Sequence, residues 1–415
     1  MQRSLVREAG GGRRAAAAKA VIPLLADGLR PFFLGASVFA VLAMVLWMGS
    51  LAGLWALAEN YGTLAWHAHE MIFGYSAAVI AGFLLTAVPN WTGRLPVAGG
   101  RLLFLFLLWC AGRAAFLVTG LTGPWPAVVL DSLFLPCLFL VVAREVIVGR
   151  NWRNLKPLML VALLAAANIG FHAEVLSTVG EGSAGIASRA AVAVIVALIM
   201  LIGGRIVPSF TRTYLSRQKS NLVGQRAAHL PVPFNRFDMA SLVVSAVALV
   251  FWVAAPQLDV TGVLFLVAAL FQFARISRWA GLYAWREPLV LVLHIGYVFV
   301  PLGFLLGGIA ILVPGVLAGT APMHAWTVGA IGVMTLAVMT RASLGHTGRA
   351  LKASALTVSV YVAVVASAVL RIVAGTVANG AFGLIELAGL AWIVGFTLFV
   401  ALYAPILVRA RLDRG

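Results

Sequence analysis

The chain has 415 residues, of which 62% are hydrophobic and only 10% are charged, and its mean hydropathy is +1.02. A soluble globular domain carries about 25% charged residues, so the composition excludes that class and predicts a membrane protein whose first partner is the lipid bilayer. The formal net charge of +17 would suggest nucleic-acid binding in a soluble protein. In a membrane protein, Lys and Arg collect in short cytoplasmic loops, so their positions distinguish the two possibilities.

The first 31 residues are basic and rich in alanine, and they contain no short apolar segment that ends in a cleavage site. We therefore expect a retained cytoplasmic tail over 1–31 rather than a signal peptide. Twelve apolar runs follow, each close to the length that a helix needs, at about 1.5 Å per residue, to cross about 30 Å of hydrocarbon. They lie near 32–56, 66–89, 101–120, 125–143, 157–179, 187–207, 238–255, 259–277, 288–312, 322–341, 352–374 and 383–408. The sequence thus predicts an all-α polytopic membrane protein with a single transmembrane domain over 32–408.

The basic residues predict the orientation of these runs. All but three of the 30 Lys and Arg residues fall in the N-terminal tail, in every second connection, or after the last run. The exceptions are Arg113, Arg189 and Arg371. Because positive residues accumulate on the cytoplasmic side, we expect both termini to be cytoplasmic, with a short C-terminal tail over 409–415. The largest inner connection, about 205–237, is expected to be a loop or a surface helix. This distribution explains the positive charge without nucleic acid.

Two pairs of residues within or beside the apolar runs have ordinary interpretations. Cys110 and Cys137 both lie inside such runs, so we expect them to be packing residues rather than a disulfide. Trp66 and Trp326 lie near the outer ends of the second and tenth runs. Tryptophan is enriched at membrane interfaces, so we expect these two indoles in the aromatic belt.

The second run opens on two histidines and a glutamate, His67, His69 and Glu70. In the predicted topology they lie at its outer end, and His324 lies at the outer end of the tenth run. His172 also falls in the outer third, about 24 Å along the fifth helix from its inner start. Imidazole and carboxylate groups cost free energy in a bilayer unless something binds or pairs them. Four histidines in one layer therefore predict a functional site near the outer face.

Helical geometry separates the two histidines of the second run. At 100° per residue, His67 and His69 point about 160° apart, so an undistorted helix cannot direct both to one metal. We expect them to serve two centres, or one to be a ligand and the other a supporting group. Glu70 lies about 60° from His67 and could orient it. Neutral imidazole binds copper, zinc and iron, and membrane haem is commonly held by histidines of facing helices.

The remaining candidates lie at both ends of the bundle. Arg189 and Arg371, near the outer ends of their helices, can clamp carboxylates such as haem propionates. Alternatively they pair with nearby acidic residues, namely Asp131, Glu174 or Glu386. His294 lies near the inner start of the ninth run, where it stands outside the outer group and would need a tilted helix or a second inner site. His346 lies just inside the membrane as either an inner-surface site or a helix cap.

Six motifs together resemble the NnrS family. They are RPFFLGA at 30–36, WHAHEMIFGY at 66–75, GFLLTAVPNWTG at 82–93, GGRIVPSFT at 203–211, LHIGY at 293–297 and HAWTVGAIGVMTLAVMTRASLGHTGR at 324–349. The resemblance implies a multi-pass protein of the bacterial inner membrane that is linked to denitrification and to the nitric oxide response, and that contains haem and copper. It also implies that five histidines occupy the motif positions of the family, namely His67, His69, His294, His324 and His346.

Together, the residues and the resemblance lead to one hypothesis for the site. A b-type haem is held by His69 and His324 from facing helices, and copper is bound at His67 and His172. The protein would then protect against nitrosative stress through nitric oxide binding or redox chemistry near the outer face. Two alternatives stay open: a quinol-linked reductase that consumes nitric oxide, and a transporter whose histidines bind substrate or protons.

Overall fold

The computed structural model describes residues 22–178, 185–220, 230–317, 319–377 and 381–412. Within these ranges all regular structure is helical, and twelve helices are long and apolar enough to cross a membrane. The predicted all-α polytopic membrane fold is thereby confirmed. Most of the predicted N-terminal tail and the last residues of the C-terminal tail lie outside the described residues.

We number the membrane spans 1 to 12 in chain order. Ten of them are each one helix, whereas spans 2 and 10 each consist of two α-helical segments joined by a π-helical one. The bounds are α2 (Leu29–Leu51), then α3 (Thr63–His69), η2 (Glu70–Tyr75) and α4 (Ser76–Thr92) for span 2, α5 (Gly100–Leu117), α7 (Trp125–Val148), α8 (Leu155–Thr178), α9 (Ile186–Ser220), α10 (Arg236–Ala254), α11 (Asp259–Ser277), α12 (Pro288–Leu312), then α13 (Thr320–His324), η5 (Ala325–Val333) and α14 (Met334–His346) for span 10, α15 (Ala355–Ala374) and α16 (Ala381–Val408). The short helix η1 (Pro23–Leu25) precedes span 1, and three more lie between spans: α6 (Thr119–Thr122), η3 (Trp152–Asn154) and η4 (Gly281–Ala284).

Span 6 is longer than the sequence predicted. The expected connection over 205–237 begins as helix, because α9 continues without a break through Arg205 to Ser220. Charged side chains made this stretch look like a loop, but they only require contact with water or headgroups and do not end a helix. The connection that remains is correspondingly shorter.

Glycine and polar residues stand at the ends of several spans. Gly93 follows α4 with a φ of 69°, and its N–H donates to the Pro89 carbonyl. This left-handed conformation is accessible to glycine because it has no Cβ. At the start of α10, the Asn235 side chain and Asp238 form a reciprocal capping box. Such caps satisfy backbone groups that a helix end leaves without partners.

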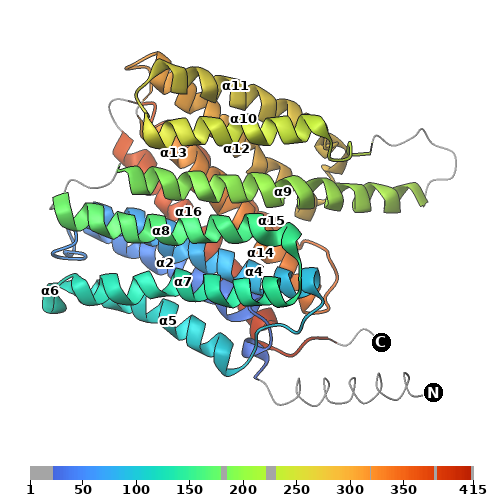
Figure 1. Ribbon diagram of the computed structural model, residues 1–415, viewed down its shortest axis with the longest axis horizontal. Coiled ribbons are helices and arrows are strands. Elements are labelled where there is room, and N and C mark those ends of the chain that lie inside the picture. The colour runs from blue at the N-terminus through green and yellow to red at the C-terminus, as the bar shows by residue number, and fades with distance from the viewer. Residues whose placement is uncertain (1–21, 179–184, 221–229, 318, 378–380, 413–415) are drawn as a thin grey trace.

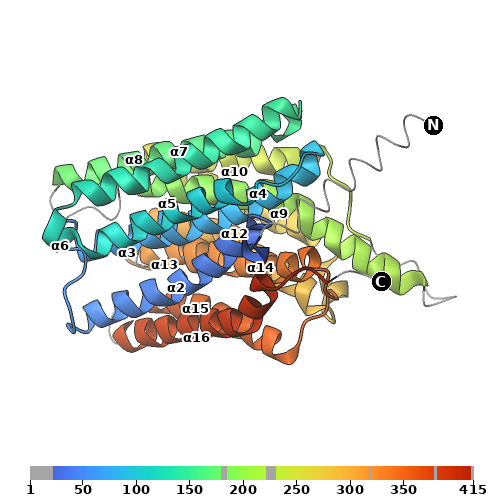
Figure 2. The same ribbon diagram turned by 90° about the horizontal axis from the view of Figure 1, so that it is seen from below.

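The spans run alongside one another in both views (Figures 1 and 2). In Figure 1, α10 and α11 lie along one edge and α5 and α7 along the other. Neighbouring pairs along the chain, such as α11 with α12 and α15 with α16, pack together, and the last helix, α16, also packs against the first, α2. Spans 2, 9 and 10 are the most deeply buried of the twelve.

The first and last spans are joined by a buried arginine. Arg30, 4% exposed, donates from Nη1 to the carbonyl of Leu407 at 2.7 Å and to that of Arg409 at 2.6 Å. Span 1 therefore begins where span 12 ends. We call this end of the bundle the basic end, because the charge count predicts it to be cytoplasmic. The other end of the bundle is called the opposite end.

Two expectations about individual residues have different outcomes. Cys110 and Cys137 are free thiols that are partly buried in the apolar packing, as expected. The aromatic-belt prediction is wrong, because Trp66 and Trp326 are each only 1% exposed. The Trp326 indole donates to the Val300 carbonyl at 3.1 Å in the bundle interior. Distance from the end of a run does not show whether a side chain faces lipid or a neighbouring helix.

Candidate functional site

Spans 2 and 10 share a local irregularity at the opposite end. His69 is the last residue of α3 and His324 is the last residue of α13, and each is followed directly by a π-helical segment, η2 and η5. A π-helix turns more slowly than an α-helix and occurs frequently at functional sites. The change of pitch alters which side chains after the histidine face the same neighbour, so the regular helical angles used for the sequence do not hold beyond these points.

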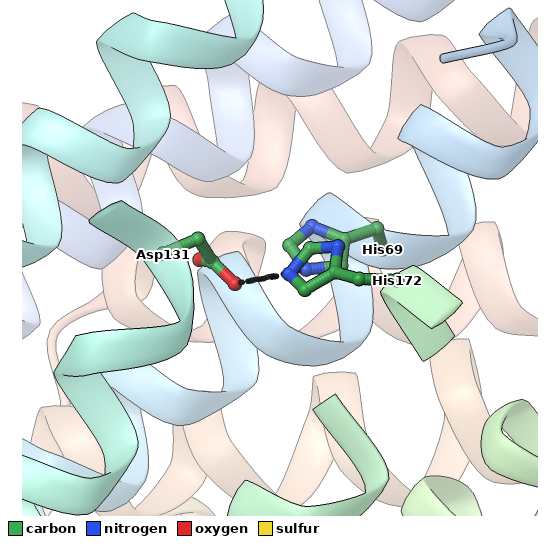
Figure 3. A group of neighbouring side chains, drawn as sticks. All are labelled: His69, Asp131 and His172. Carbon is green, nitrogen blue, oxygen red and sulfur yellow. Dashed lines mark hydrogen bonds and ion pairs between the residues drawn. The ribbon is translucent and has the colours of Figure 1, made fainter. Parts of the chain in front are cut away.

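Three side chains from three spans meet beside span 2 (Figure 3). His69 from α3, Asp131 from α7 and His172 from α8 each place one potential ligand atom within 4.8 Å of the other two. The Nε2 atoms of His69 and His172 lie 3.1 and 3.0 Å from the same oxygen of Asp131, Oδ2. All three residues are buried. We call this group the histidine–aspartate cluster.

An arginine and a second carboxylate complete one side of the histidine–aspartate cluster. Glu70 Oε1 lies 3.1 Å from His69 Nδ1, and Glu70 Oε2 accepts from Arg113 Nη1 at 2.6 Å. The other guanidinium nitrogen, Nη2, forms an ion pair with Asp131 Oδ1. Arg113 itself is 6% exposed. It therefore holds both carboxylates in place from α5.

Two neutral side chains complete the other side. Asn168, one turn before His172 on α8, donates from Nδ2 to Asp131 Oδ2 at 2.7 Å, and its Oδ1 lies 2.9 Å from His69 Nε2. The Tyr61 hydroxyl lies 2.8 Å from His172 Nδ1. Since His172 Nε2 faces a carboxylate, it carries the hydrogen, and Nδ1 accepts from the tyrosine.

The histidine–aspartate cluster lacks one positive charge when both imidazoles are neutral. Two carboxylates, Glu70 and Asp131, face one guanidinium, Arg113. Moreover, both ring nitrogens of His69 face acceptors, whereas a neutral imidazole has a single N–H to donate. A second proton on His69, a proton on one of the two carboxylates, or a cation held by the imidazoles and the carboxylate restores the balance. Burying an uncompensated charge is costly, so the geometry favours one of these three states.

A second site lies on the other side of span 2. His67 and His324 line one pocket together with Arg371 from α15, and apolar residues form most of the remaining wall. His324 Nδ1 donates to the Thr320 carbonyl at 2.7 Å, which leaves the lone pair on Nε2. This is how proteins fix the tautomer of histidines that bind metals. We call this the histidine pocket.

The partners of His67 and Arg371 leave both groups available in the histidine pocket. The His67 ring stacks on Trp47 with 4.2 Å between ring centroids, and its buried Nδ1 has no hydrogen-bond partner in the part of the chain that the structure describes. Arg371 has no carboxylate within ion-pair distance among the described residues. A buried nitrogen without a partner and a cation without an anion are both features of a ligand site.

The residue types that line the histidine pocket are suited to haem, but the volume of the pocket is too small for it. The two imidazoles, from facing spans, could hold a haem iron, and the guanidinium could bind a propionate. The cavity, however, measures about 80 Å³, while pockets for ligands of drug size measure about 300–1,000 Å³. It accommodates an ion or a diatomic molecule as it stands. A macrocycle would require the flexible walls formed by Met44, Met48 and Met71 to move outward.

The four outer histidines are paired differently in the structure from the pairs that the sequence suggested. We expected His69 with His324 and His67 with His172, but His69 meets His172 and His67 shares a pocket with His324. The angular argument that separates His67 from His69 agrees with this arrangement. The sequence does not show which span lies on each side of span 2, and this decides which histidines meet. Glu70 likewise contacts His69 rather than His67, because the π-helix begins at this residue.

The other predicted residues lie apart from both sites. His294 is buried at the basic end, where its Nε2 lies 2.8 Å from the Thr211 hydroxyl. His346 is the last residue of α14, and its Nδ1 lies 3.6 Å from Asp27. Arg189 places Nη2 3.4 Å from the Val253 carbonyl. Neither His294 nor His346 has a second histidine in its described surroundings.

Sequence reasoning missed most of the supporting residues of the histidine–aspartate cluster. One of the alternatives left open paired Arg189 or Arg371 with Asp131, whereas the arginine that pairs with Asp131 is Arg113. Asn168 and Tyr61 were not identified at all. Two signals were present: Asn168 lies four residues before His172, on the same helical face, and Arg113 and Asp131 are opposite charges inside consecutive membrane runs.

Comparison with known proteins supplies the family. No curated protein matches the chain. A family model described as NnrS protein matches residues 23–411. The matched residues include all twelve spans, the histidine–aspartate cluster and the histidine pocket. On the extent of this match, the chain belongs to the NnrS family.

Proposed function

We propose that this protein binds copper in the histidine–aspartate cluster and, after the methionine wall of the histidine pocket has moved outward, haem b in that pocket, and that it protects a bacterial inner membrane against nitric oxide. Membership of the NnrS family supports a role in the nitric oxide response. The observation that carries the metal proposal is the buried cluster of His69, Asp131 and His172, which needs one more positive charge when both carboxylates are ionised and both imidazoles are neutral. A monovalent copper ion would supply it.

The residues of the histidine–aspartate cluster have separate roles in this proposal. His69, His172 and Asp131 supply two nitrogens and one oxygen, a donor set that suits copper, zinc or iron. Arg113 fixes the carboxylates, while Asn168 and Tyr61 fix the imidazole orientations through the contacts described above. Such supporting contacts commonly change metal affinity by about 10–100-fold. When the metal enters, a second proton on His69 would leave, and the hydrogen of His172 would move from Nε2 to Nδ1, where it can be donated to the Tyr61 hydroxyl.

In the histidine pocket, His67 and His324 would hold the haem and Arg371 would bind a propionate. When bound, haem iron supplies a site that takes nitric oxide or passes an electron, depending on its axial ligands and surroundings. The chain's own contribution is to aim His324 through Thr320 and to keep an apolar wall around the pocket. Two sites on opposite sides of one short helix would lie close enough for a metal in one to influence the other.

The test is a visible spectrum with metal analysis on purified protein and single variants. We expect His67→Ala and His324→Ala to lose the Soret band and keep copper, and His69→Ala and His172→Ala to lose copper and keep the Soret band. His294→Gln, a buried histidine at the basic end, should keep both and serves as the control. A full Soret band in both His67→Ala and His324→Ala would overturn the haem assignment.

The same preparation distinguishes the alternative functions. Anaerobic consumption of nitric oxide with a quinol donor would establish a reductase with quinol as a partner. Stoichiometric nitric oxide binding without turnover would establish a protein that buffers nitric oxide. Wild-type protein without a Soret band and without bound metal would overturn the proposal and leave the transporter.

A further inference from the structure

A large cavity lies at the basic end, away from both histidine sites. Its volume is about 650 Å³, and spans 2, 6 and 10 contribute much of its wall through α4, α9 and α14. One side is formed by Ile202, Arg205, Ile206 and Phe210 of α9, around the point where the sequence predicted the inner connection, a loop or a surface helix, to begin. We call it the arginine cavity.

The arginine cavity is strongly basic. Arg205, Arg341, Arg411 and His346 line it, and none of the described lining residues is acidic. Two carboxylates lie near this lining: Asp27 is 3.6 Å from the Nδ1 of His346, and Glu287 interacts with Arg341 from beyond ion-pair distance. The Arg341 guanidinium lies 4.0 Å from the centre of the Phe210 ring. In the described parts of the chain, no carboxylate lies within ion-pair distance of the three arginines.

Polarity changes with depth in the arginine cavity. Arg205 and Arg411 are exposed, and Arg341 is half-buried. Deeper in the bundle the wall is apolar, with the fully buried Phe33 and the half-buried Ile202 and Val338. A small soluble anion would satisfy only the rim, whereas a molecule with an anionic head and an apolar chain would match both parts.

We propose that the arginine cavity binds an anionic phospholipid, with its phosphate at Arg205 and Arg341 and its acyl chain along the apolar wall. Basic pockets between spans on the cytoplasmic side commonly bind such headgroups. Guanidinium groups bind phosphate oxygens through paired hydrogen bonds. A volume of about 650 Å³ exceeds what inorganic phosphate needs and lies within the usual range for larger ligands. The bound lipid would join spans 2, 6 and 10 at the end remote from the histidine sites.

Lipid binding can be measured by native mass spectrometry of delipidated protein with added phosphatidylglycerol, and separately with phosphatidylethanolamine or inorganic phosphate. We expect retention of phosphatidylglycerol in preference to the other two. Arg205→Gln and Arg341→Gln should each weaken it about fivefold, which corresponds to about 1 kcal/mol per arginine near a membrane surface. Arg205 is exposed, so its replacement should not disturb folding.

The matched control is Arg236→Gln, which removes an exposed arginine at the basic end that does not line the cavity. Arg205→Lys keeps the charge and should retain most of the binding. Three results would overturn the proposal: an equal loss in Arg236→Gln, equal retention of phosphatidylethanolamine, or saturation by inorganic phosphate alone. The first would mean a diffuse surface charge, and the last a site for a soluble anion.

Discussion

Arg113 lies at the centre of the contacts that position the candidate metal ligands. It pairs with Glu70 and Asp131, and its guanidinium carbon lies 5.9 Å from the Phe39 ring centre and 5.8 Å from that of Phe116. The sequence marked it only as one of three arginines outside the predicted cytoplasmic segments. Its role follows from having two carboxylates within reach in a site that excludes water.

Replacing Arg113 should therefore be severe. We expect Arg113→Met to lower the free energy of unfolding by about 3–5 kcal/mol, because it leaves two buried carboxylates without their cation. The measurement is denaturant unfolding in detergent micelles. The control is Arg144→Met, since Arg144 pairs with Glu145 at 3.1 Å with a side chain that is 58% exposed, and such pairs contribute about 0–1 kcal/mol. Similar losses in both variants would contradict this account.

Residue types predicted part of the site, and their pairing could not be predicted. His69, His172, His67 and His324 were identified because ionisable groups in a membrane layer require partners. Which histidine meets which depends on the rotation of each span and on its neighbours. Asn168 escaped notice because a single amide in an apolar run has no pattern of its own.

At the scale of elements, the two π segments distinguish spans 2 and 10 from regular helices. The segment η5 packs against α12, where the Trp326 indole lies over Gly303. A Cβ added at Gly303 would lie 2.2 Å from Trp326 Nε1. The indole is buried and bonded to Val300, so it has little freedom to move away. Gly303 thus sets how closely span 9 approaches the span that presents His324.

We expect Gly303→Ala to lower the free energy of unfolding by about 1–3 kcal/mol, the usual effect of overpacking. It should also shift the spectrum of any chromophore bound at His324, because span 10 must move. Thermal unfolding and the visible spectrum would be recorded together. Gly383→Ala is the control, since a Cβ there meets no atom within 4 Å. Unchanged stability in Gly303→Ala would show that this contact is not tight.

The spans themselves were predictable, and their ends less so. Each apolar run is long enough to leave few alternatives to a membrane helix, and all twelve are present. The end of span 6 was missed because α9 continues into charged sequence. The π segments were missed because they depend on hydrogen bonds along the backbone, which side-chain patterns do not record.

For the whole molecule, the charge distribution predicts one orientation in the membrane. We expect a fluorescent reporter fused after Gly415 to be active and a phosphatase fused there to be inactive, because basic segments remain in the cytoplasm. A phosphatase inserted after Asn60, in the connection between spans 1 and 2, should be active. Immunoblots of the fusion proteins control for their expression. The reverse pattern would place the histidine sites on the cytoplasmic side.

The contact between Arg30 and the carbonyls of Leu407 and Arg409 has a consequence for biosynthesis. The ribosome produces Arg30 almost four hundred residues before these partners, so the first span waits in the membrane with its guanidinium unmatched until translation is nearly finished. A truncated chain that lacks span 12 therefore leaves the Arg30 guanidinium exposed to lipid and water, whereas the complete chain buries it. Quality-control proteases that monitor membrane segments could distinguish it from the finished protein.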